Sequence, residues 1–91
     1  MTSFEKLRER MLANPSVKAE YDRLGPVYEV VGALIDARHA AGLTQAQLAE
    51  RMGTKQSVIA RLETARRLPS LEMVARYAAA TGRRVALVRD E

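Results

Sequence analysis

The amino-acid sequence predicts an all-α fold: a five-helix domain with an N-terminal helical extension and a short C-terminal β-strand. Three observations lead to this prediction. Apolar residues recur at spacings of three and four through most of the 91 residues, which is the period of an amphipathic helix. Glycine and proline interrupt the pattern at points where helices are expected to end. The last apolar segment is short and rich in β-branched residues, which is typical of a strand.

Residues 1–24 are predicted to form the N-terminal helical extension, interrupted at Asn14 and Pro15. Its apolar positions follow helical spacing: Phe4, Leu7, Met11, Leu12, Val17, Tyr21 and Leu24. A free tail would not keep this much apolar surface exposed. We therefore expect the extension to pack partly on its own domain and partly on a partner protein. Gly25 and Pro26 are expected to end it and to begin the next helix.

The central domain is predicted over residues 25–82. Its first helix spans residues 26–41 and ends at Gly42. One face of that helix carries Val27, Val30, Val31, Leu34, Ile35 and Arg38. Since the whole chain has only four aromatic residues, we expect an aliphatic core.

Two short helices follow, and their signals indicate a helix-turn-helix motif. Thr44 and Gln47 have the spacing of a capping box at the start of the first, which runs to Met52. Gly53 permits a tight turn, and the second helix is expected from about Lys55 to Thr64. The inward positions are Leu48, Ala49, Met52, Ile59 and Leu62. A further helix, capped by Ser70, is expected to reach Gly82.

The outward face of the second short helix is predicted to read DNA. Its candidate base-reading residues are Lys55, Gln56, Ser57 and Arg61. Glutamine can bond adenine in a bidentate manner, and lysine or arginine can bond guanine, in a major groove that admits one helix. Gln45, Arg66 and Arg67 are the candidate phosphate contacts, Gln45 because it begins a helix. The alternative for the base-reading residues is an ordinary polar helix face, and the alternative for Arg66 and Arg67 is that they are two solvated loop arginines.

The charge distribution agrees with a polyanionic partner such as double-stranded operator DNA. The net charge is +4, and residues 1–42 are neutral overall. Residues 51–84 carry eight basic side chains against two acidic ones, Glu63 and Glu72. A one-sided basic region is typical of nucleic-acid binding, although a solvated basic surface has the same composition.

Residues 83–91 are predicted to form a dimerisation strand and tail. The strand residues are Val85, Ala86, Leu87 and Val88. A lone strand on a helical domain leaves its backbone groups unpaired, so we expect it to pair antiparallel with a second copy of the chain. The resulting homodimer would present two reading helices to a palindromic site.

A structural ion pair is predicted between Arg38 and Glu63. Arg38 continues the apolar stripe of its helix, where an unpaired guanidinium would be costly. Glu63 follows the inward-facing Leu62 and is expected to turn towards the same interior. The alternative is that Arg38 extends past the stripe to solvent.

These motifs resemble the Cro/repressor-type (XRE) helix-turn-helix family. The resemblance rests on residues 43–53, on the run Ile59-Ala60-Arg61-Leu62-Glu63 and on Pro69-Ser70-Leu71. Residues 14–21 and the apolar C-terminal segment are similar to the HigA-type antitoxins within it. That likeness implies the antitoxin of a type II toxin-antitoxin pair, which neutralises a RelE-like ribonuclease toxin and represses its own operon. The family also pairs an arginine and a glutamate at the positions of Arg38 and Glu63. Ala65 departs from the family's usual glycine, and a positive φ there would strain the loop.

Two other functions are weighed against this interpretation. One is a stand-alone XRE-type regulator without a toxin, and the other is a protein-interaction adaptor without DNA affinity. Enzymatic activity is not expected, because the acidic residues are scattered and His39, the only histidine, has no catalytic or metal-ligand neighbours in the sequence. No cofactor, metal or membrane association is predicted, and the absence of cysteine agrees with a cytoplasmic protein.

Overall fold

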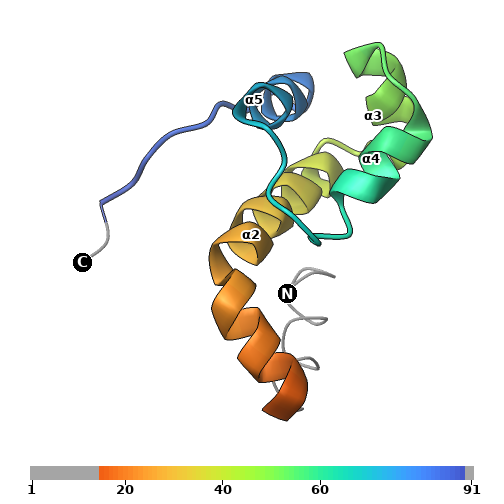
Figure 1. The fold of residues 1–91 in the computed structure, drawn as a ribbon. Coiled ribbons are helices and arrows are strands. Elements are labelled where there is room, and N and C mark those ends of the chain that lie inside the picture. Colours follow the sequence, from red (N-terminus) through yellow and green to blue (C-terminus); the bar gives the residue numbers. More distant parts are fainter. Residues whose placement is uncertain (1–14, 90–91) are drawn as a thin grey trace.

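The computed structural model describes the backbone of residues 15–89 and the side chains of residues 25–89. This part of the chain is all-α, as predicted, with four helices and no strand. The helices are α2 (Pro15–Ala40), α3 (Gln45–Met52), α4 (Gln56–Leu62) and α5 (Leu71–Ala80). α3 and α4 lie together on one side of the molecule, and α5 packs near the C-terminal half of α2 (Figure 1). None of these helices is long and apolar enough to cross a membrane.

The predicted helix break at Gly25 and Pro26 is wrong, and with it the count of five helices. α2 is continuous from Pro15 to Ala40 and contains Pro26. Proline fixes φ at a value that a helix can use, so a helix continues through it at the cost of one backbone hydrogen bond and some crowding. The prediction for residues 1–14 lies outside the described residues.

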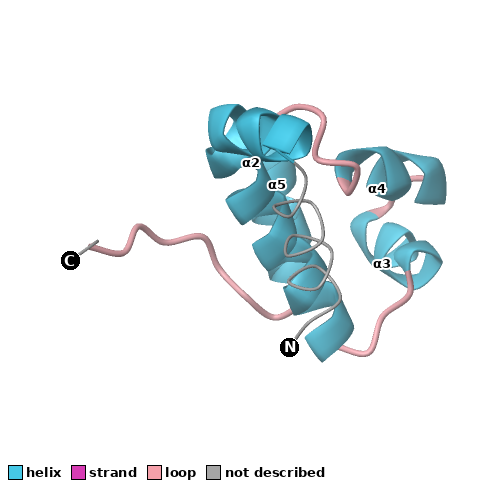
Figure 2. Ribbon diagram, turned by 90° about the horizontal axis from the view of Figure 1, so that it is seen from below, coloured by secondary structure: helices cyan, strands magenta, loops and turns pink. Residues whose placement is uncertain are grey.

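The predicted C-terminal strand is also wrong. Residues 83–89 have no regular secondary structure and lead away from the helices (Figures 1 and 2). Their apolar side chains are exposed, and Leu87 is fully so. A β-branched sequence forms a strand only where another strand completes its hydrogen bonds, and the described part of this chain offers none.

The helix ends follow the predicted capping signals. The hydroxyl of Thr44 accepts a hydrogen bond from the Gln47 backbone N–H at 3.1 Å, and the Gln47 side chain accepts one from the Thr44 N–H at 2.9 Å. Ser70 caps α5 in the same manner by accepting from the Met73 N–H. α4 is shorter than predicted, because Lys55 is its N-cap and Glu63 its C-cap.

The core joins the four helices around a cluster of buried side chains. Its members are Leu34, Leu48, Ala49, Met52, Ile59, Val74 and Tyr77. Tyr77 is fully buried, so the expectation of a purely aliphatic core is wrong. This core holds α3 and α4 against α2 and α5. It therefore fixes the position of α3 and α4 relative to each other and to the rest of the domain.

Candidate nucleic-acid interface

The turn between α3 and α4 has the geometry of a helix-turn-helix motif. Gly53 adopts a left-handed conformation with φ 66°, and its N–H donates to the Glu50 carbonyl at 3.1 Å. The Thr54 N–H donates to the Ala49 carbonyl at 2.9 Å. A residue with a β-carbon is disfavoured at such a φ, so glycine allows this short connection.

Packing of α4 on the core leaves its other face open. Ile59 is buried, and Leu62 packs partly against the core. The four candidate base-reading residues are exposed: Lys55, Gln56, Ser57 and Arg61. They therefore lie on the surface that can approach a DNA groove, with Lys55 just before the helix.

Gln45, the first residue of α3, lies between the exposed face of α4 and the interior. Its Oε1 accepts a hydrogen bond from Gln56 Nε2 at 2.7 Å. Its Nε2 donates to Glu63 Oε1 at 3.0 Å. Gln45 is thus bonded to a candidate base-reading residue as well as being placed at a helix N-terminus. Sequence reasoning missed this link, because it depends on how the two helices cross.

Glu63 connects the motif to α2 and α5. Its carboxylate accepts two hydrogen bonds from Arg38, from Nε at 2.8 Å and from Nη2 at 2.9 Å. The pair is therefore bidentate, and the side chains of Arg38 and Glu63 are 10% and 6% exposed. Glu63 also accepts from the Tyr77 hydroxyl at 2.6 Å, while Arg38 Nη1 donates to the Leu43 carbonyl at 2.9 Å.

The ionisation of this cluster follows from its contacts. Burial alone would raise the pKa of the Glu63 carboxyl, but hydrogen bonds from Arg38, Tyr77 and Gln45 outweigh burial and hold the pKa below its ordinary value. The hydrogen bond to Glu63 raises the pKa of Arg38. Burial, followed by the bond to Glu63, raises the pKa of the Tyr77 hydroxyl. Glu63 is thus a buried carboxylate that can only accept hydrogen bonds.

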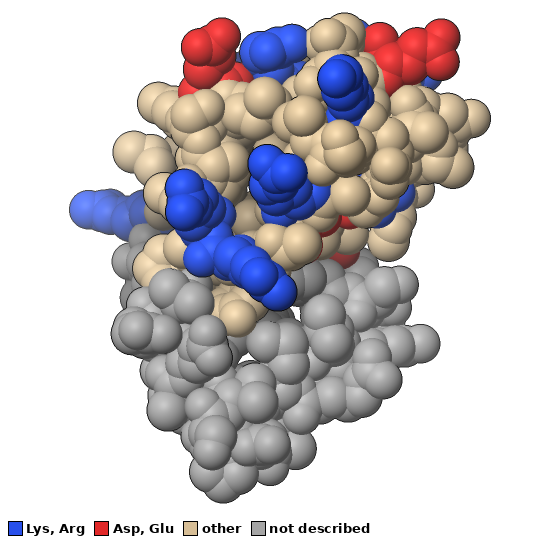
Figure 3. All heavy atoms as spheres, turned by 45° about the vertical axis from the view of Figure 1, so that its right-hand side comes forward, with Lys and Arg blue, Asp and Glu red and all other residues tan. Residues whose placement is uncertain are grey.

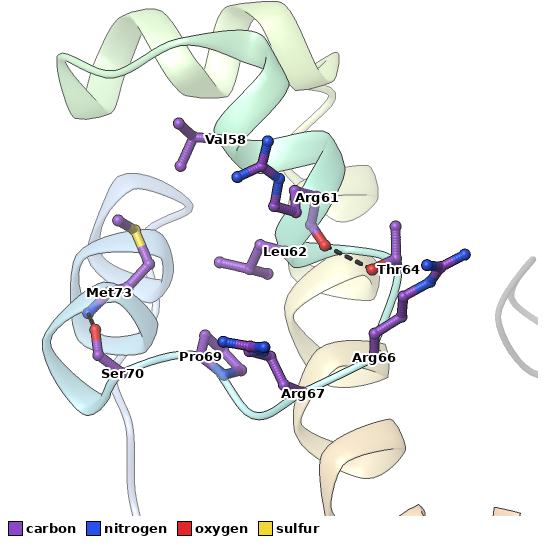
Figure 4. Close-up of a pocket in the computed structure, with 9 residues that line it drawn as sticks. All are labelled: Val58, Arg61, Leu62, Thr64, Arg66, Arg67, Pro69, Ser70 and Met73. Carbon is purple, nitrogen blue, oxygen red and sulfur yellow. Dashed lines mark hydrogen bonds between the residues drawn. The ribbon is translucent and has the colours of Figure 1, made fainter.

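Three arginines are among the residues that line a groove beside α4. The groove has a volume of about 670 Å³. Its lining residues are Val58, Arg61, Leu62, Thr64, Arg66, Arg67, Pro69, Ser70 and Met73 (Figure 4). The guanidinium groups of Arg61 and Arg67 turn towards the groove, whereas that of Arg66 turns away (Figure 4). Lys and Arg side chains gather on this side of the molecule, and acidic side chains lie mainly at its upper edge (Figure 3).

The loop that carries Arg66 and Arg67 begins with a strained residue. Ala65 has a φ of 58° and is 3% exposed. Positive φ is unfavourable for alanine, in agreement with the strain expected from the departure at this position. The turn nevertheless fixes where the two following arginines leave the domain.

The family comparison agrees with this geometry. A helix-turn-helix family model matches residues 34–88. The chain belongs to the XRE-type helix-turn-helix family. The match covers all the residues of α3, α4 and α5 and supports the predicted DNA-binding role. Among the described side chains, those of residues 25–89, no group of three His, Cys, Asp or Glu is placed to hold a metal ion.

Curated relatives provide a more specific comparison. The chain is 33% identical over 84 residues to the antitoxin HigA1 of two Mycobacterium tuberculosis strains, CDC 1551 / Oshkosh and ATCC 25618 / H37Rv. The aligned region is 92% of this chain and 56% of each relative, so the chain spans about half the length of the relatives it matches. No solved structure gives a significant match.

Proposed function

We propose that the protein is a sequence-specific DNA-binding transcriptional repressor and not an enzyme. The observation that carries the proposal is the exposed face of α4, held by the glycine turn and the core, with Gln56 and Arg61 outward and Arg66 and Arg67 beside it. In this proposal Lys55, Gln56, Ser57 and Arg61 contact base edges in the major groove. Arg66 and Arg67, in the loop after α4, neutralise phosphates of the DNA backbone next to the groove.

Binding to the DNA directly upstream of the protein's own reading frame tests this proposal. Fluorescence anisotropy with that duplex and with a shuffled duplex of equal length should give tighter binding to the natural sequence. The affinity should fall steeply with salt, because neutralised phosphates release counterions. Equal binding to both duplexes would reject a repressor, and no salt-dependent binding at all would favour the protein-interaction adaptor.

We further propose that the repressor is the antitoxin of a type II toxin-antitoxin pair acting in the cytoplasm. The specific support is the similarity to the HigA1 antitoxins over 92% of this chain. By this analogy it would neutralise a RelE-like ribonuclease toxin and repress the operon that encodes both proteins. Co-expression with the product of the adjacent reading frame should relieve growth inhibition by that product and yield a stable complex. A product that is harmless and does not bind would favour a stand-alone regulator.

A homodimer is part of the proposal, because one reading helix covers only half of a palindromic operator. The exposed apolar side chains of Val85, Leu87 and Val88 support the existence of a further protein contact. Light scattering at micromolar concentration tests the dimer directly. A monomeric mass, both for the free protein and for the protein bound to DNA, would reject the homodimer.

A further inference from the structure

We propose that the groove beside α4 binds an aromatic organic anion, which releases the protein from DNA by holding Arg61 and Arg67 in the groove. Three properties of the groove support this: its size, the charge of its lining and the apolar side chains beside that charge. Binding of the anion can be measured without DNA. Its regulatory effect rests on the proposed function, because both arginines belong to the proposed DNA-binding surface.

The groove is large enough for a small organic molecule. Its volume of about 670 Å³ lies within the range of ~300–1,000 Å³ that is typical of small-molecule sites. α4 contributes Leu62, α5 contributes Met73, and the loop between the two helices contributes Arg67 and Pro69 (Figure 4). Leu62 and Met73 also pack partly against the core, so the core holds these parts of the lining in place.

The charge of the groove is one-sided. The guanidinium groups of Arg61 and Arg67 turn towards it, and no acidic side chain is among its described lining residues (Figure 4). Neither guanidinium has a hydrogen-bond or ion-pair partner within residues 25–89. Ser70 Oγ accepts from the Met73 N–H at 3.1 Å, which leaves the hydroxyl hydrogen free to donate. An anion in the groove would supply the missing counter-charge, and a carboxylate or sulfonate matches the planar donors of arginine.

The apolar part of the lining favours an anion that has an aromatic body. Its members are Val58, Leu62, Pro69 and Met73. A small hydrated ion such as phosphate gains nothing from these side chains, whereas a ring is stabilised by leaving water to pack on them. Rings also make favourable contacts with the thioether of methionine and with the flat faces of arginine guanidinium groups.

Such a ligand and DNA would compete for the same two arginines. Arg61 is a proposed base-reading residue, and Arg67 is a proposed phosphate contact. A guanidinium that is turned into the groove and paired there with an anion cannot extend to DNA at the same time (Figure 4). The charge of the ligand would also repel nearby phosphates. The anion therefore binds the free protein more tightly than the DNA-bound protein and acts as an inducer that lifts repression.

Binding of the dye 8-anilinonaphthalene-1-sulfonate tests the site without DNA. This dye is an aromatic sulfonate that fluoresces in apolar surroundings, and N-phenyl-1-naphthylamine is the same molecule without the sulfonate. The dye should bind the full chain at one molecule per chain and more tightly than the neutral analogue. Arg61→Gln and Arg67→Gln should each weaken dye binding about threefold, within the range of exposed ion pairs, and should not affect the analogue.

Arg84→Gln is the matched control, and thermal melts show whether each variant is folded. It removes an equally exposed arginine, which lies next to the exposed apolar side chains of Val85 and Leu87. Dye binding should be unchanged in this variant. If Arg84→Gln weakens dye binding and the two groove substitutions do not, the dye binds the tail and the proposed site is overturned. Equal affinity for the dye and the neutral analogue would also overturn it.

Competition with DNA tests the release. The DNA is a duplex that the protein selects from a random-sequence library, labelled with a red fluorophore. With the dye at ten times its Kd, the apparent affinity for this duplex should fall about elevenfold. An unchanged affinity while the dye is bound would overturn the proposed release. If the protein selects no duplex, the proposed function fails, whereas the dye measurements still decide whether the groove binds an aromatic anion.

Discussion

Replacing Glu63 with alanine removes the acceptor that joins α2, α4 and α5. Arg38 then loses two hydrogen bonds and its counter-charge, and the buried Tyr77 hydroxyl loses its acceptor. Arg38 remains bonded to the Leu43 carbonyl through Nη1, which holds the stranded guanidinium in the interior.

The expected loss of stability follows from these groups. A buried donor without a partner costs about 1–3 kcal/mol; Arg38 and Tyr77 leave three such donors after the substitution, and the half-buried Gln45 Nε2 loses its acceptor as well. Water entering the space of the lost side chain offsets part of that cost. Breaking one side of a buried ion pair costs about 3–5 kcal/mol, so we expect Glu63→Ala to lie in that range. For a domain of this size, that is a large share of the total stability.

Urea unfolding followed by circular dichroism measures this free energy. Tyr77→Phe is the matched control, because it keeps the buried ring and removes only one hydrogen bond to Glu63. It should cost about 1.5–3 kcal/mol, less than Glu63→Ala. The reasoning would be refuted if Glu63→Ala changed the free energy of unfolding by less than about 1 kcal/mol, the value typical of exposed ion pairs.

Three further predictions concern Glu63, Tyr77 and Ala65. Folding lowers the pKa of Glu63, so the stability that its ionised carboxylate contributes is present above the unfolded-state pKa and is lost as pH falls through the folded-state pKa. The difference in unfolding free energy between wild type and Glu63→Gln, measured in urea melts, should therefore narrow below about pH 5. Because the pKa of Tyr77 is raised by folding, wild type should lose stability above about pH 10 more steeply than Tyr77→Phe, and parallel pH profiles would contradict this. Glycine at position 65 would relieve the left-handed strain, but it would lose a buried methyl group and add entropy to the unfolded state. These effects oppose each other, so Ala65→Gly should change the free energy of unfolding by less than about 1 kcal/mol. Ala65→Val should cost more than about 2 kcal/mol. Equal melting temperatures for these two variants would argue against a left-handed residue.

Features set by neighbouring residues could be predicted from the sequence. The capping box of Thr44 and Gln47 depends on four consecutive residues, and the turn at Gly53 on a glycine between two short apolar patterns. The ion pair joins residues that are far apart in the sequence. It could still be predicted, because a charged residue within the apolar stripe of α2 indicated that Arg38 needed a buried partner.

Features that local signals alone do not decide could not be predicted in the same way. Gly25 and Pro26 are stop signals locally, yet α2 continues through them. The β-branched residues near Val85 favour a strand only where a partner strand exists. The burial of Tyr77 could have been predicted from the sequence but was missed. Tyr77 lies three residues after the inward-facing Val74 and therefore on the core face of α5.

The central claim is that α4 reads bases while the following loop holds the phosphate backbone. Salt titrations of wild type, Gln56→Ala and Arg67→Ala on a selected site and on random DNA test it most directly. Arg67→Ala should weaken binding to both DNAs and reduce the slope of log affinity against log salt by about one. Gln56→Ala should keep the slope and lose about 1–3 kcal/mol on the selected site alone. An equal loss on both DNAs for Gln56→Ala would contradict the assignment of α4 as the reading helix.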